Sequence, residues 1–105
     1  MSEEHTLKLT NQCHSKRGMS YDFRKHPDKI TVRITPRESA SDTADWRIDA
    51  SDGPRGEKVF TEWGATKREA LHAVATTWTK HAEAEGLPVF DWNAITELLV
   101  NVRAL

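Results

Sequence analysis

The spacing of hydrophobic residues in this chain changes near Thr66. Before Thr66 the period is two residues, and after Thr66 it is about 3.6 residues. Before the change, Ile30, Val32 and Ile34 alternate with polar residues, which is typical of a strand with one buried face. After the change, apolar residues recur three and four positions apart, which is typical of an amphipathic helix. The sequence therefore predicts strands first and helices last, an α+β order.

Four strands are predicted before Thr66. Alternation and β-branched residues place them at 19–24, 30–35, 46–50 and 58–63. Turn-forming residues at 25–28 and 51–56 favour tight connections, and the polar segment 37–45 favours a loop. Successive strands joined in this way predict a four-stranded antiparallel β-meander.

The fourth strand has apolar residues on both faces, so its orientation is ambiguous. Val59 and Trp63 share one face, and Phe60 lies on the other. Two apolar side chains bury more area than one, at about 25 cal/mol per Å², so we expect Val59 and Trp63 to face inward. Trp63 lies at a strand end beside Gly64, so we also expect it to be partly exposed and to contact a partner.

Two helices are predicted at the C-terminal end. Residues 66–69 read Thr-Lys-Arg-Glu, a capping box, and the apolar stripe that follows continues for about five turns to Gly86. Asp91 is the expected N-cap of the second helix. With both helices packed on one sheet face, the fold is expected to be a two-layer α+β sandwich.

The domain organisation follows from where the periodicity begins. Residues 1–18 contain little periodicity and are predicted to be a flexible N-terminal segment, with a short edge strand at 6–10 as an alternative. Residues 19–105 are predicted to form a single α+β domain, because a chain of 105 residues has the size of one core.

Charge and cysteine content suggest a soluble cytoplasmic protein. Fifteen Lys and Arg against sixteen Asp and Glu give a net charge of −1, so the total charge predicts no attraction to polyanions or to membranes. The N-terminus is acidic, unlike a signal peptide. The single cysteine, Cys13, cannot form an internal disulfide.

Catalytic and metal-binding patterns are weak in this sequence, so we expect no enzyme, no metal and no cofactor. Cys13 and His14 are adjacent and would point apart, and His72 and His81 lie on opposite sides of the predicted helix. No phosphate loop, nucleophile elbow or HExxH stretch occurs. A catalytic pair assembled from distant positions stays open as a third reading.

The segment from Trp46 to Trp78 resembles three unrelated families: HicB-like antitoxins, plant AP2-type DNA-binding domains and double-stranded-RNA-binding domains. The shared features are a tryptophan-led strand, a Gly-rich turn, a further strand and a capped helix. The AP2-type resemblance implies that Arg33, Arg47 and Lys58 contact DNA from the sheet. Asp49 and Glu62 are expected on that same face.

The open face of the sheet is the expected site of function. Its predicted residues are Asp22, Arg24, Thr31, Arg33, Thr35, Arg47, Asp49, Lys58, Phe60 and Glu62. The leading hypothesis is a non-enzymatic domain that binds a protein partner through this face or an edge strand, with Arg24, Arg33, Arg47, Lys58, Phe60 and Trp63 as contact residues. The alternative is nucleic-acid binding through Lys16, Arg17, Arg24, Lys25, Arg33 and Arg47.

Overall fold

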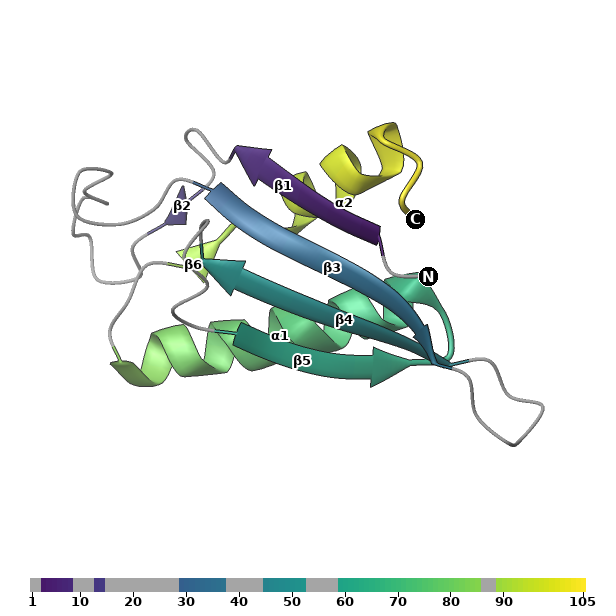
Figure 1. Cartoon of the computed structure of the whole chain (residues 1–105). Coiled ribbons are helices and arrows are strands. Elements are labelled where there is room, and N and C mark those ends of the chain that lie inside the picture. The colour runs from purple at the N-terminus through teal and green to yellow at the C-terminus, as the bar shows by residue number, and fades with distance from the viewer. Residues whose placement is uncertain (1–2, 9–12, 15–28, 38–44, 53–58, 86–88) are drawn as a thin grey trace.

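The described part of this chain is built around a four-stranded antiparallel sheet with two helices on one face (Figure 1). The computed structural model describes residues 3–8, 13–14, 29–37, 45–52, 59–85 and 89–105. Across the sheet the strands are β1 (Glu3–Lys8), β3 (Lys29–Arg37), β4 (Asp45–Asp52) and β5 (Val59–Gly64). The helices are α1 (Lys67–Glu85) and α2 (Trp92–Asn101). The predicted α+β class, with antiparallel strands followed by two helices, is confirmed.

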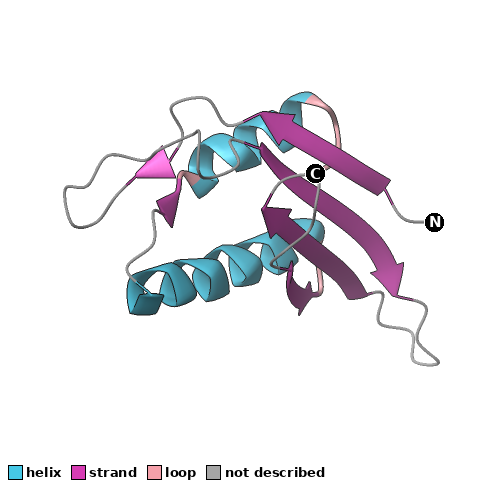
Figure 2. Ribbon diagram, turned by 60° about the vertical axis from the view of Figure 1, so that its left-hand side comes forward, coloured by secondary structure: helices cyan, strands magenta, loops and turns pink. Residues whose placement is uncertain are grey.

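Two further short strands form a separate ladder beside the helices (Figure 2). They are β2 (Cys13–His14) and β6 (Val89–Phe90), and they pair antiparallel. β6 directly precedes α2, so this ladder ties the start of α2 to the N-terminal part of the chain.

The first strand of the sheet lies within the predicted flexible segment 1–18 and overlaps the alternative that the sequence left open, a short edge strand at 6–10. Residues 3–8 are not a segment outside the sheet: they form β1, which pairs with β3 from Glu3 opposite Ile34 to Lys8 opposite Lys29. β1 takes the position beside β3 that the sequence assigned to residues 19–24, which lie outside the described residues. The sequence of β1 has only a weak hydrophobic pattern, because Leu7 is the one buried residue of this strand.

The core lies between the sheet and the helices. Ile30, Val32 and Ile34 of β3 and Ile48 and Ala50 of β4 point to the helix side and are fully buried, as their alternation predicted. Ala70, Leu71, Val74, Trp78 and Ala82 are the buried residues of α1, and Ile95 and Leu99 are those of α2. The predicted inward faces of β3 and β4 are therefore confirmed.

The starts of both helices follow the predicted capping residues. The Thr66 hydroxyl accepts a hydrogen bond from the Glu69 backbone N–H at 3.1 Å. The Glu69 carboxylate accepts from the backbone N–H of Ala65 at 3.1 Å, one residue earlier than in a standard capping box. At the start of α2, the Asp91 carboxylate accepts from the backbone N–H groups of Asn93 and Ala94.

β5 has the opposite orientation from the one predicted, so this prediction is wrong. Phe60 lies opposite Ala50 on the helix side, whereas Val59 and Trp63 point to the open face. Phe60 packs on Trp78 of α1 with ring centroids 4.5 Å apart. An aromatic cluster on the helix side therefore contains Phe60, Trp78, Phe90 and Trp92, and Trp63 lies outside it.

The close approach of α1 to β5 explains this orientation. Gly64 is on the same face of β5 as Phe60, and a Cβ built on Gly64 would lie 2.4 Å from the backbone nitrogen of Ala70. A residue with a side chain therefore cannot face α1 at this position. Two apolar residues outweigh one in buried area, but the glycine decides which face of β5 meets the helix.

The C-terminal end of α2 is closed by a Schellman motif. The backbone N–H of Ala104 donates to the Leu99 carbonyl at 2.8 Å, and that of Arg103 donates to the Val100 carbonyl at 2.9 Å. Arg103 adopts the left-handed conformation, with φ of 57°. Val102 is the exposed C-cap, because α2 ends at Asn101.

Replacing Arg103 with glycine is expected to stabilise the protein by about 0.5 to 1 kcal/mol. A residue with a Cβ is strained in the left-handed region, and glycine is not; the greater freedom of the unfolded glycine chain offsets part of that gain. Urea unfolding measures the difference. Arg103→Ala is the matched control, because it removes the same charge and keeps the Cβ. Equal stabilities of the two variants would contradict the strain explanation.

Candidate functional site

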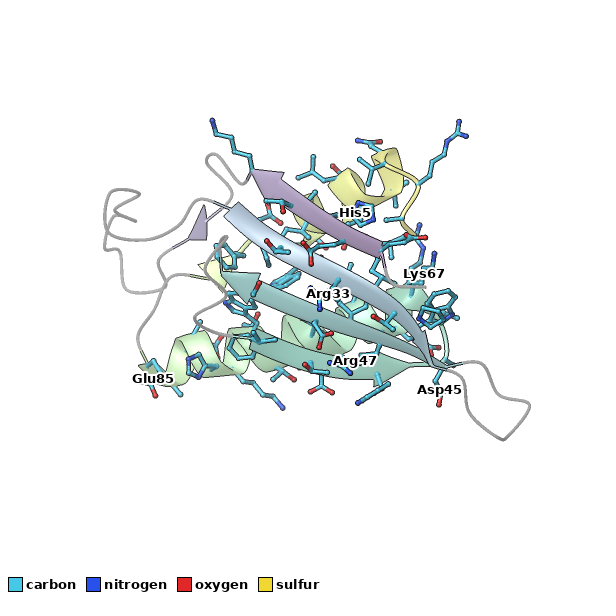
Figure 3. All side chains as sticks on the ribbon, in the orientation of Figure 1. His5, Arg33, Asp45, Arg47, Lys67 and Glu85 are labelled. Atoms are coloured by element: carbon cyan, nitrogen blue, oxygen red, sulfur yellow. The ribbon has the colours of Figure 1, made fainter. Side chains whose placement is uncertain are left out.

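The face of the sheet away from the helices carries three rows of side chains, which together we call the open face. The rows follow the strand register: Glu4, Arg33, Asp49 and Thr61; Thr6, Thr31, Ser51 and Val59; and Thr35, Arg47 and Trp63. Figure 3 looks onto this face, with Arg33 and Arg47 lying over the central strands. Every sheet strand contributes to it, so its side chains are held at fixed spacings.

The first row begins with an ion pair between β1 and β3. The guanidinium of Arg33 donates to one carboxylate oxygen of Glu4, from Nε at 3.1 Å and from Nη2 at 2.7 Å. The hydrogen bond to Glu4 and the charge of that carboxylate raise the pKa of Arg33 above its ordinary value. Arg33 is therefore charged at any physiological pH, and its nearest counter-ion belongs to this chain.

Asp49 connects the first row to the third. Its carboxylate accepts from the hydroxyl of Thr61 on β5 and, at 3.1 Å, from Nε of Arg47 two residues earlier on β4. The Arg47 guanidinium also lies over the ring of Trp63, 5.7 Å from its centroid. Arg47, like Arg33 a basic residue predicted on this face, is thus held between the carboxylate of Asp49 and the ring of Trp63.

The two edge strands of the sheet differ in character. β1 presents the exposed charged residues Glu3, Glu4 and Lys8, which discourage pairing with another strand. β5 presents Val59, which is 57% exposed, and Trp63, which is 44% exposed. Among the strands that the structure describes, β5 pairs with β4 alone. We call the side of β5 that faces away from β4, with Val59, Thr61 and Trp63, the β5 edge.

The structure brings together three of the six residues predicted to contact a partner. Arg33, Arg47 and Trp63 lie on the open face, and the predicted partial exposure of Trp63 is confirmed. Phe60 lies on the opposite, helix-facing side, as does Glu62, whose carboxylate accepts from the Thr77 hydroxyl at 2.8 Å. The remaining two, Arg24 and Lys58, lie outside the described residues, as do Asp22 and the basic residues Lys16, Arg17 and Lys25.

The residues of this face that the sequence did not predict there are Glu4, Thr6, Ser51, Val59, Thr61 and Trp63. Glu4 belongs to a strand with little hydrophobic alternation. Val59 and Thr61 follow from the orientation of β5, and the signal that could have placed them is Gly64, which has to face α1.

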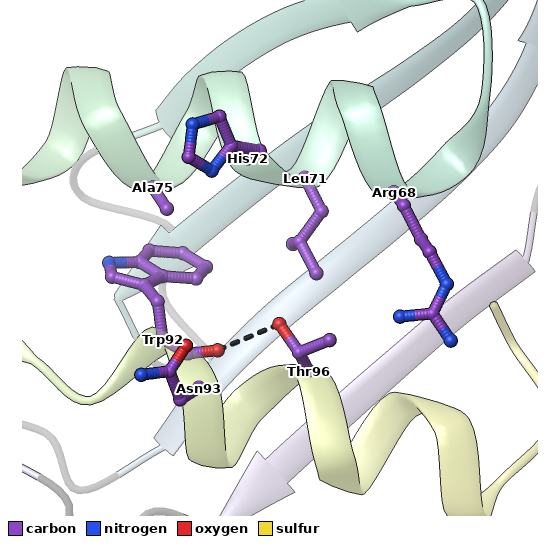
Figure 4. A pocket seen from close by; sticks show the side chains of 7 residues that line it. All are labelled: Arg68, Leu71, His72, Ala75, Trp92, Asn93 and Thr96. Atoms are coloured by element: carbon purple, nitrogen blue, oxygen red, sulfur yellow. Dashed lines mark hydrogen bonds between the residues drawn. The ribbon is translucent and has the colours of Figure 1, made fainter.

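A groove of about 220 Å³ runs between the two helices, on the other side of the sheet (Figure 4). Arg68, Leu71, His72 and Ala75 line it from α1, and Trp92, Asn93 and Thr96 line it from α2. The indole Nε1 of Trp92 is buried and has no hydrogen-bond acceptor among the described residues. The lining of the groove is partly apolar, from Leu71, Ala75 and Trp92, and otherwise polar. None of the residues that line it carries a carboxylate.

The described part of the chain contains no cluster of three or more His, Cys, Asp or Glu residues placed to hold a metal ion. No helix in the described ranges is long and apolar enough to cross a membrane.

No known protein family, curated protein or solved structure matches this chain. The geometry of the open face and the β5 edge is therefore the basis for proposing a function.

Proposed function

We propose that this chain is a small, non-enzymatic, cytoplasmic interaction domain that binds a protein partner by strand addition at the β5 edge. The observation that carries the proposal is the exposure of Val59 and Trp63 on a strand that, within the described residues, pairs with β4 alone. An added strand would supply backbone hydrogen bonds to β5, and its side chains would cover the two apolar residues. The charged β1 edge offers no comparable surface.

Nucleic-acid binding through the same face is the alternative, and the charges of the open face argue against it. Arg33 and Arg47 each have a carboxylate partner in Glu4 and Asp49, so a phosphate would have to displace a group of this chain. A single-strand platform also uses several stacking aromatics. On the described part of the open face, Trp63 is the one aromatic residue.

Capture from native extract, with the tagged protein as bait, tests the proposal. Trp63→Lys places a charge on the β5 edge, and Thr6→Lys is the matched control because it places the same charge on β1. We expect wild type and Thr6→Lys to retain the same partner protein. An untagged copy of this chain counts as such a partner. The amount of protein retained by Trp63→Lys is expected to be at least about tenfold lower. The substitution removes an aromatic side chain from the interface, and a lysine on an edge strand discourages pairing with another strand.

The captured protein is then identified by mass spectrometry and mixed with the bait in purified form, after nuclease treatment and at high salt. Binding that persists and still depends on Trp63 supports the proposal. Equal capture by all three baits contradicts it. Loss of all binding with nuclease or salt would favour the nucleic-acid alternative instead.

A further inference from the structure

We propose that the partner at the β5 edge is a second copy of this chain, paired antiparallel around a twofold axis at Thr61. This inference rests on the proposed function and names the occupant of the same site. The β5 edge is complementary to itself, and that property is what selects this occupant.

The complementarity is set by the spacing of the exposed residues. In an antiparallel pair related by a twofold axis at Thr61, Val59 lies opposite Trp63 of the second copy, and Trp63 lies opposite Val59 of the second copy. Both exposed apolar residues of β5 are then covered by each other. A shift of two residues in either direction breaks this match, because Thr61 would then face Val59 or Trp63.

The polar row of the open face also continues across this axis. Within one copy the row runs Glu4, Arg33, Asp49 and Thr61, with alternating charge and a terminal hydroxyl. In the proposed register, Thr61 meets Thr61 of the second copy, a cross-strand pair that is favourable in antiparallel sheets. In this register the polar rows of the two copies meet at Thr61, and the exposed apolar residues of one copy meet those of the other.

The helix beneath β5 presents both small and long side chains toward such a neighbour. The Thr77 hydroxyl of α1 donates to Glu62 of β5 at 2.8 Å, which places Thr77 on the side of α1 nearest β5. Ala73 and Ala84 lie four residues before and seven residues after Thr77, on the same side of the helix. Lys80 and His81 lie on this side too, so the long Lys80 side chain would have to turn toward solvent for a second α1 to approach over Ala73 and Ala84 once the two β5 strands pair.

The mass of the full chain in solution, measured by sedimentation, tests the inference. We expect the mass of wild type to rise with concentration from 11.9 kDa toward twice that value. Thr61→Lys would place two lysines opposite each other at the axis, and it is expected to weaken association by at least about tenfold. Thr6→Lys, on the charged β1 edge, is expected to associate as wild type does.

A cysteine at the axis tests the register directly and does not depend on a loss of function. In a Cys13→Ser background, Thr61→Cys is expected to form a disulfide-linked dimer under mild oxidation, and Thr6→Cys is not. Wild type that stays monomeric at every concentration, or equal cross-linking at both positions, would overturn the inference. Monomeric wild type whose capture of another protein still depends on Trp63 would overturn this inference alone. Capture that ignores Trp63 would overturn the proposed function.

Discussion

Replacing Gly64 with alanine is expected to destabilise the fold by roughly 3 kcal/mol or more, because the added methyl group would meet backbone atoms. A Cβ at this position would lie 2.4 Å from the backbone nitrogen of Ala70 and 2.8 Å from the carbonyl carbon of Glu69. Both atoms belong to the first turn of α1, which would have to move away from the sheet. Urea unfolding followed by tryptophan fluorescence measures the loss.

The control for this prediction removes the nearest side chain and leaves the backbone in place. Adding Ala70→Gly to Gly64→Ala is not expected to restore stability, because the close atoms of Ala70 are its backbone nitrogen and Cα. A Gly64→Ala variant within about 1 kcal/mol of wild type would show that close approach to α1 does not explain the orientation of β5.

Replacing Phe60 with alanine is expected to cost about 3 kcal/mol, because the ring packs against the buried core. Its centroid lies 4.5 Å from that of Trp78 and 5.3 Å from that of His81, so truncation leaves a cavity under β5. The expected cost of Trp63→Ala is below about 1 kcal/mol, because that ring is nearly half exposed and lies over Arg47.

The two truncations together decide which face of β5 is buried. They lie three residues apart on one strand, and each removes an aromatic ring. If Trp63→Ala costs more than Phe60→Ala in urea unfolding, β5 has the opposite orientation, and the β5 edge loses the two exposed apolar residues on which the proposed function depends.

The sequence predicted the elements whose local signals agree with one another. In β3, the alternation of Ile30, Val32 and Ile34 specifies one buried face without a competing signal. Both helix starts follow from their capping residues, Thr66 and Asp91, because a side-chain acceptor is needed where the first N–H groups have no helical partner. Such features depend on residues close in sequence, and inspection of the sequence can find them.

β5 and β1 could not be assigned in the same way, because their positions depend on distant contacts. The buried face of β5 is set by Gly64 against α1 and by Phe60 against Trp78. β1 is joined to β3 by main-chain pairing and by the ion pair of Glu4 with Arg33, which is 29 residues away. Neither contact produces a periodic pattern in the sequence.

The same distinction explains what was predictable of the candidate site. Arg33 and Arg47 were expected on the open face because the faces of β3 and β4 were clear. Their carboxylate partners change what these arginines can do, and those partners were not predicted to contact them. The partial exposure of Trp63 followed from its position at a strand end, although its face did not.

Amide hydrogen exchange of wild-type protein at low and high concentration, resolved by residue, tests the pairing of β5 with a second copy most directly. In the dilute protein, the amides of β5 that do not donate to β4 should exchange rapidly, as should the unpaired amides of β1. If β5 pairs with a second copy, those β5 amides become protected from exchange at high concentration, while the amides of β1 exchange as before. Exchange at β5 that does not change with concentration, or protection gained at β1 instead, would contradict it.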